Sequence, residues 1–189
     1  MGRPAGRTRT RRTRLAGRQV GALIGAIAGL VFVLINAGAA AGPWAWVLRG
    51  LGIVAFAGVL WVSVLRRERV PADQPPPSAS AWRVYWVMVA FEVVLLPVGV
   101  KLLVRLDHPE LTVPWVALIV GVHFLPFARA FEAPVFRVLG LVLIGLAVVG
   151  GVLGLRAGAD VATLVAGIGS GIALLAFAFH VRPRLPVHE

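Results

Sequence analysis

The 189-residue sequence contains no cysteine, and charged residues make up only 14% of it. Without cysteine, the protein has no disulfide, no thiolate nucleophile and no Cys-ligated zinc or iron–sulfur cluster. The charged share is well below the roughly 25% that is typical of soluble domains. So few charges leave little polar surface to cover a core, which argues against an ordinary soluble domain.

Apolar residues take the place of the missing charges. The set AVILMFWYC makes up 59% of the chain, and with the 22 glycines the share reaches about 71%, against about 45–50% in soluble proteins. A chain this apolar is not intrinsically disordered. The composition therefore predicts an integral membrane protein.

Six stretches approach the about 20 apolar residues that a membrane-spanning helix needs. They predict an all-α, polytopic transmembrane helix bundle between an Arg-rich tail at 1–18 and a short tail at 181–189. The prolines within 66–83 make that connection a non-helical loop. The six predicted spans are 19–37, 46–65, 84–103, 113–130, 135–155 and 161–180.

The distribution of positive charge predicts the orientation of the spans. With the N-terminus inside, fifteen of the nineteen Lys and Arg residues fall in cytoplasmic segments, and the positive-inside bias then places both termini in the cytoplasm. Eighteen of the nineteen are arginine, which together with many Ala, Gly and Val residues is typical of a GC-rich bacterial genome. We therefore expect the bacterial plasma membrane, with Arg49 and Lys101 extending to the outer interface.

The tail at 1–18 has three interpretations. Its seven arginines, without an acidic residue, indicate a topology anchor that lies on anionic lipid. The tail, the following apolar stretch and Ala37-Gly38-Ala39 also resemble a secretory signal, although a stretch of about 18 residues exceeds the usual length of roughly 7–15. An Arg-rich arm binds nucleic acid electrostatically, but this tail lacks an aromatic residue for base stacking, so no nucleic-acid partner is expected.

Three predicted spans carry glycines at four-residue spacing, which places these glycines on one helix face. Such faces let helix backbones approach closely in a membrane. We expect the first, fifth and sixth spans to pack through them, with the partner inside the chain, in a homodimer or in another membrane protein. The glycines are Gly21, Gly25, Gly29, Gly150, Gly154, Gly167 and Gly171.

Two ionisable residues, Glu92 and His123, stand inside the third and fourth predicted spans. At about 1.5 Å per residue they lie about 12 Å and about 11 Å from the cytoplasmic ends of those spans, and so at the same depth. A lone ionised carboxylate at that depth costs on the order of 2.5–3.5 kcal/mol. Glu92 is therefore expected to be protonated, to pair with His123 or to face a hydrated cavity.

Two interpretations of this pair stay open. In the first, Glu92 and His123 line a polar pocket that relays protons or binds a small cationic or polar solute. Pro97 and Pro126, each about one turn beyond, would then loosen their helices and free carbonyl groups nearby. In the second, the pair only fixes the register of a helix hairpin, although interhelical hydrogen bonds in membranes average about 0.6 kcal/mol. The leading expectation is a small protein that binds or passes a solute or proton, and the alternative is a structural or accessory subunit.

Other motifs carry little chemistry. Asp107, His108 and Glu110 lie in a Pro-containing outer loop without helical metal-ligand spacing, so no metal site is expected. The glycines of 167–171 lie in an apolar span and lack the lysine of a phosphate-binding loop. With no Ser/His/Asp set and no zinc-protease motif, the sequence predicts neither an enzyme nor a bound cofactor.

One segment carries a resemblance to known proteins. Residues 115–131 contain the pattern Gly121-x-His123-Phe-Leu-Pro126-x-Ala-Arg129. The segment resembles one found in functionally uncharacterised small polytopic integral membrane proteins of bacteria, where another apolar span follows it. The resemblance implies a membrane location and treats His123, Pro126 and Arg129 as a unit, but it implies no activity.

Overall fold

The computed structural model describes residues 17–65, 78–131 and 133–180. These residues form helices with short connections and no β-strand, so the fold is an all-α bundle. Most of the tail at 1–18, the prolines of 66–77 and the tail at 181–189 lie outside the described residues. The helices are α1 (Gly17–Asn36), α2 (Trp44–Leu65), α3 (Ala79–Arg105), α4 (Thr112–Ala130), α5 (Pro134–Ala157), α6 (Ala159–Ala162) and α7 (Gly169–His180), with the short turns η1 (Ala37–Ala39), η2 (Pro109–Leu111) and η3 (Thr163–Ile168).

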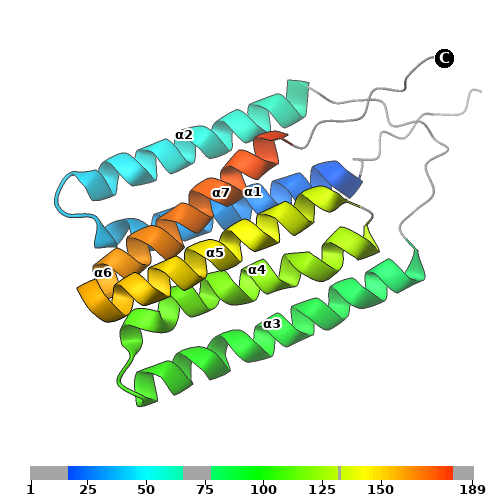
Figure 1. Cartoon of the computed structure of the whole chain (residues 1–189). Coiled ribbons are helices and arrows are strands. Elements are labelled where there is room, and N and C mark those ends of the chain that lie inside the picture. The colour runs from blue at the N-terminus through cyan, green and yellow to red at the C-terminus, as the bar shows by residue number, and fades with distance from the viewer. Residues whose placement is uncertain (1–16, 66–77, 132, 181–189) are drawn as a thin grey trace, which may run out of the picture.

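The long helices lie side by side with their axes roughly aligned (Figure 1). Helices α2 and α3 occupy opposite edges of the bundle, and α1, α4, α5 and α7 lie between them. The central contacts join α4 to α5 and α1 to α7. At its edge, α3 packs mainly against α4, which leaves most of the α3 surface exposed.

Five of the described helical segments are long and apolar enough to cross a membrane. Their surfaces expose large hydrophobic side chains, which lipid accepts and water does not. The chain therefore has the architecture of a multi-pass membrane protein. The five segments are Trp44–Val62, Ala79–Arg105, Pro109–Ala130, Pro134–Ala157 and Ala159–His180, and a shorter apolar helix covers Leu23–Ala39.

Two helices differ from the predicted spans. Helix α3 begins at Ala79 rather than near 84, because the Ser78 hydroxyl caps it by accepting a hydrogen bond from the Ala81 amide at 3.2 Å. The sixth predicted span is not one regular helix, because the π-helical turn η3 separates α6 from α7. Hydropathy measures the apolar length of a segment and detects neither a cap nor a change of helix type.

The glycine faces of α1, α5 and the sixth span meet inside the chain. Gly29 and Gly171 face each other, since a Cβ on Gly29 would lie 2.9 Å from the Gly171 carbonyl oxygen. A Cβ on Gly150 would lie 2.8 Å from the Cβ of Ala166, and Gly154 approaches α6 in the same way. These backbones are therefore close enough for van der Waals contact along the helices.

The remaining glycines of the pattern differ from one another. Gly167 lies in η3 against Asn36, whose Cγ would be 2.5 Å from a Cβ at position 167. The Cβ position of Gly25 has nothing within 4 Å, so Gly25 makes no close contact with another helix among the described residues. The surroundings of Gly21 lie outside the described side chains. Four-residue spacing places glycines on one face but does not show how far the partner helix extends along it.

A further glycine pair joins α4 to α5. A Cβ on Gly140 would lie 2.7 Å from the Gly121 carbonyl oxygen, and a Cβ on Gly121 would lie 3.0 Å from the Gly140 carbonyl oxygen. Both glycines are buried. Each helix contributes one glycine to this contact, so no repeated spacing marks it in the sequence.

Arg49 contacts the end of α1. Its Nε atom donates a hydrogen bond to the Leu34 carbonyl at 3.5 Å, in the last turn of α1, and its guanidinium carbon lies 5.1 Å from the centroid of the Trp46 ring. A cation is favoured both at a helix C-terminus and over an aromatic face. Arg49 therefore ties the start of α2 to the end of α1, whereas Lys101 is exposed.

Candidate functional site

Glu92 and His123 come together between α3 and α4. Glu92 is the middle residue of α3, and His123 lies in the C-terminal half of α4. The Oε2 atom of Glu92 is 2.9 Å from the Nδ1 atom of His123. The two antiparallel helices therefore place one carboxyl group and one imidazole in direct contact within apolar surroundings.

The contact is close but poorly aligned. The Glu92 oxygen lies off the direction in which the ring nitrogen could donate, so His123 Nδ1 is buried without a hydrogen-bond partner among the described residues. The side chains of Glu92 and His123 are 27% and 13% exposed. Part of the carboxylate side chain is thus reachable from outside the bundle, while the imidazole lies deeper.

Aromatic rings continue from the pair toward the N-terminal end of α3. The His123 and Phe127 rings meet edge to face with their centroids 4.4 Å apart, and Phe127 stacks on Tyr85 with centroids 5.8 Å apart. Tyr85 in turn meets Trp82 and Trp86 edge on. Edge-to-face and stacked arrangements are both favourable for aromatic pairs. These rings therefore hold the part of the site nearest the N-terminal end of α3 in a defined geometry.

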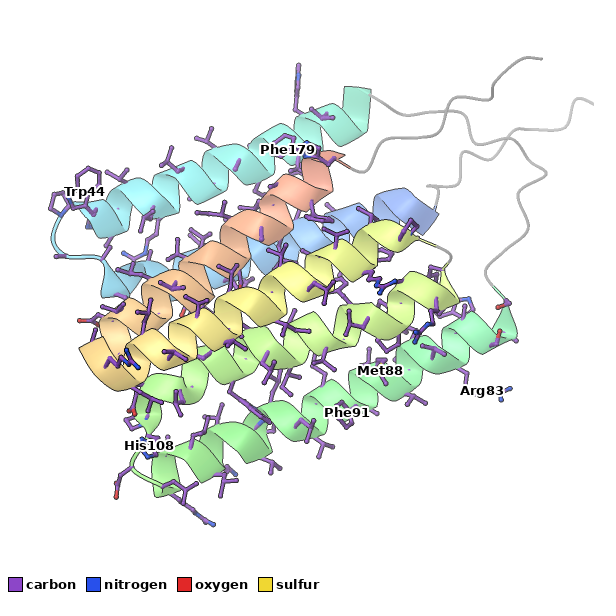
Figure 2. The ribbon with its side chains drawn as sticks, viewed as in Figure 1. Trp44, Arg83, Met88, Phe91, His108 and Phe179 are labelled. Carbon is purple, nitrogen blue, oxygen red and sulfur yellow. The ribbon has the colours of Figure 1, made fainter. Side chains whose placement is uncertain are left out.

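Helical spacing explains why these residues meet. Tyr85, Met88 and Glu92 follow one another at three and four residues, which places them on one face of α3. His123 and Phe127 are one turn apart on α4. These five residues are called the α3–α4 seam below, and Figure 2 shows Met88 in its place along α3.

Pro97 and Pro126 lie inside α3 and α4, and both helices continue through them. Proline lacks the N–H group that would bond the carbonyl four residues earlier. Those carbonyls belong to Val93 and Val122, the chain neighbours of Glu92 and His123. The prolines thus remove one helical hydrogen bond beside each member of the pair without ending either helix.

A second polar contact joins α3 to α4 beyond the pair. The Trp115 Nε1–H group donates a hydrogen bond to the Leu95 carbonyl at 3.1 Å. The Trp115 ring lies over Gly99, where a Cβ would overlap it. This contact holds the two helices together independently of Glu92 and His123.

His108 and Glu110 form a pair in the connection between α3 and α4. His108 Nδ1 and Glu110 Oε1 are 2.8 Å apart, and Asp107 has the positive φ of 60° that a tight turn requires. Within the ranges that the structure describes, no group of three His, Cys, Asp or Glu residues could hold a metal ion. His108 lies at the opposite end of α3 from Arg83 (Figure 2).

Sequence reasoning missed the aromatic half of the seam. Tyr85 precedes Glu92 by seven residues and Phe127 follows His123 by four, and these helical spacings are the signal that could have identified them. Arg129, grouped with His123 by the resemblance, is exposed in the last turn of α4 and lies outside the seam.

Comparison with known proteins yields no relative. No protein-family model, curated protein or solved structure matches the chain. A functional assignment therefore rests on the geometry of the seam.

Proposed function

We propose that this chain is a small, non-enzymatic protein of the bacterial plasma membrane whose Glu92–His123 pair exchanges protons and binds or passes a small solute or proton. The observation that carries the proposal is the 2.9 Å contact between these residues, well inside two long apolar helices. Ionisable side chains at such depth are costly and by default mark a functional site.

The poor alignment of the contact supports a functional role over a structural one. An interhelical hydrogen bond in a membrane contributes about 0.6 kcal/mol on average, and a misaligned one contributes less. Trp115 and the Tyr85–Phe127 stack already hold α3 to α4. The Glu92–His123 contact therefore adds little to the stability of the α3–α4 pair. Stability alone does not explain why a carboxyl group and an imidazole are buried there.

The proposal includes six spans with both termini in the cytoplasm. The cytoplasmic end would then hold Arg83, and the opposite end would hold Trp44 and His108 (Figure 2). The N-terminal tail would lie on anionic lipid. Core residues Ala26 and Val33 of α1 support a first span that is not cleaved, because its loss would expose the faces of α2 and α7 that pack on it.

Proton flux into liposomes tests the proposal. The full chain is reconstituted with a pH-sensitive dye inside the vesicles, and a potassium diffusion potential drives protons inward. Because Glu92 is the exchanging carboxyl group, we expect the wild-type chain to acidify the lumen at least tenfold faster than Glu92→Gln, which should match protein-free vesicles.

The matched control is Glu110→Gln, which removes a carboxyl group at η2 and should leave the flux unchanged. Equal flux through the wild-type chain and Glu92→Gln, or no flux through either, would contradict proton exchange at the pair. The second outcome favours the alternative of a structural or accessory subunit, which would associate tightly with a membrane partner.

A further inference from the structure

The surroundings of Glu92 restrict what reaches it. The flanking residues Phe91 and Val93 on α3 and Val122 on α4 are exposed on the bundle surface and apolar. Helix α3 lies at the edge of the bundle, and 27% of the Glu92 side chain is exposed on it, next in sequence to Phe91 and Val93. A ligand that arrives through the surrounding membrane therefore needs an apolar body.

We propose that the α3–α4 seam binds a lipophilic organic cation that enters from the membrane, with its charge on the Glu92 carboxylate and its apolar groups along Met88 and Tyr85. The inference rests on the proposed function and names the solute of the same site. It defines a chemical class, a hydrophobic quaternary or tertiary onium ion, rather than an individual compound.

The seam suits an organic cation better than a metal ion. It offers a single carboxylate and one imidazole, and the described residues hold no group of three that could ligate a metal. A small ion gives up a large hydration energy and needs several oxygen ligands in return. An onium ion spreads its charge over a large volume, so one carboxylate and nearby aromatic rings are enough to hold it.

The aromatic rings supply the second part of the recognition. Tyr85 is partly exposed and stacks on Phe127, which is buried beside His123, so Tyr85 is the ring of the seam that a ligand can contact. A desolvated cation gains attraction from aromatic faces, and a flexible Met88 side chain adapts to ligands of different shape. The same rings would offer nothing to a small polar anion.

Binding exchanges the cation for a proton. Where the carboxyl group carries a proton, it gives this proton up to water as it accepts the onium ion, so the charge at the site is conserved. His123 contacts the carboxylate at 2.9 Å, so a charged imidazole opposes the ligand as well. The other titratable groups on the described elements of this region are Arg83, Tyr85, Lys101 and Arg105 of α3, Glu110 of η2 and Arg129 of α4.

Binding of tetraphenylphosphonium to the purified full chain in detergent tests the inference by equilibrium dialysis. We expect saturable binding that weakens at least tenfold in Glu92→Gln and persists in Glu92→Asp. Tyr85→Leu should weaken it severalfold. Glu110→Gln is the matched control without effect, and triphenylphosphine oxide is the neutral probe that should show no dependence on Glu92.

Two results would overturn the inference. One is tetraphenylphosphonium binding as tight in folded Glu92→Gln as in the wild type, and the other is binding no greater than to empty micelles. If Glu92-dependent proton flux persists in liposomes alongside either result, the cation inference fails and the proposed function stands. If both the binding and the flux are absent, both fail.

Discussion

Gly140→Ala should destabilise the protein by about 1–3 kcal/mol, the range of overpacking in a closely packed interior. The new methyl group would lie 2.7 Å from the Gly121 carbonyl oxygen, and a backbone atom cannot move aside as a side chain does. Helices α4 and α5 must then separate. Thermal unfolding of the purified chain in detergent measures the loss.

Gly145→Ala is the matched control on the same helix. The Cβ position of Gly145 has nothing within 4 Å, and the residue is exposed. Alanine there should leave the unfolding temperature unchanged or raise it slightly, since alanine exceeds glycine in helix propensity by about 1 kcal/mol in water. Equal changes in the unfolding temperature for Gly140→Ala and Gly145→Ala would show that the close contact between Gly121 and Gly140 does not contribute to stability.

Dicyclohexylcarbodiimide should modify Glu92 almost selectively. This reagent dissolves in hydrocarbon and reacts with protonated carboxyl groups, and Glu92 is partly exposed between apolar residues. We expect peptide mass spectrometry to find the stable acylurea on Glu92. Glu92→Gln should abolish at least nine-tenths of the labelling.

A water-soluble carbodiimide provides the control for this experiment. It should react with Glu110 at η2, where the carboxyl group pairs with the exposed His108 side chain, and should leave Glu92 unmodified. Preferential labelling of Glu92 by the water-soluble reagent would place the seam in contact with water and contradict access through the membrane.

Much of the fold follows from composition and hydropathy. The apolar stretches give the all-α class and the approximate positions of the long helices, because a membrane accepts long apolar helices and little else. The start of α3 and the π-helical turn η3 could not be predicted, since both depend on local hydrogen bonds. The Gly121–Gly140 contact could not be predicted either, because the points where helices cross are determined by tertiary packing and not by residue spacing within one helix.

The candidate site was predictable in part. Counting residues from the ends of two antiparallel helices places Glu92 and His123 at one depth, and the rise per residue is nearly constant. The position of a residue along its helix does not give the orientation of its side chain. The poor alignment of the His123 ring with the Glu92 carboxyl group therefore could not be predicted. The stack of Phe127 on Tyr85 also depends on the rotation of α3 against α4, which hydropathy leaves undetermined.

The central claim is that the Glu92–His123 pair is retained for proton exchange and not for stability. Thermal unfolding of the wild type, Glu92→Gln, His123→Gln and the double variant tests it most directly, because the cycle isolates the coupling between the two side chains. We predict that Glu92→Gln leaves the stability unchanged or raises it, as expected of a group kept at some cost to the fold. Losses of about 1 kcal/mol or more in both single variants, with a non-additive double variant, would identify a structural bridge and contradict the claim.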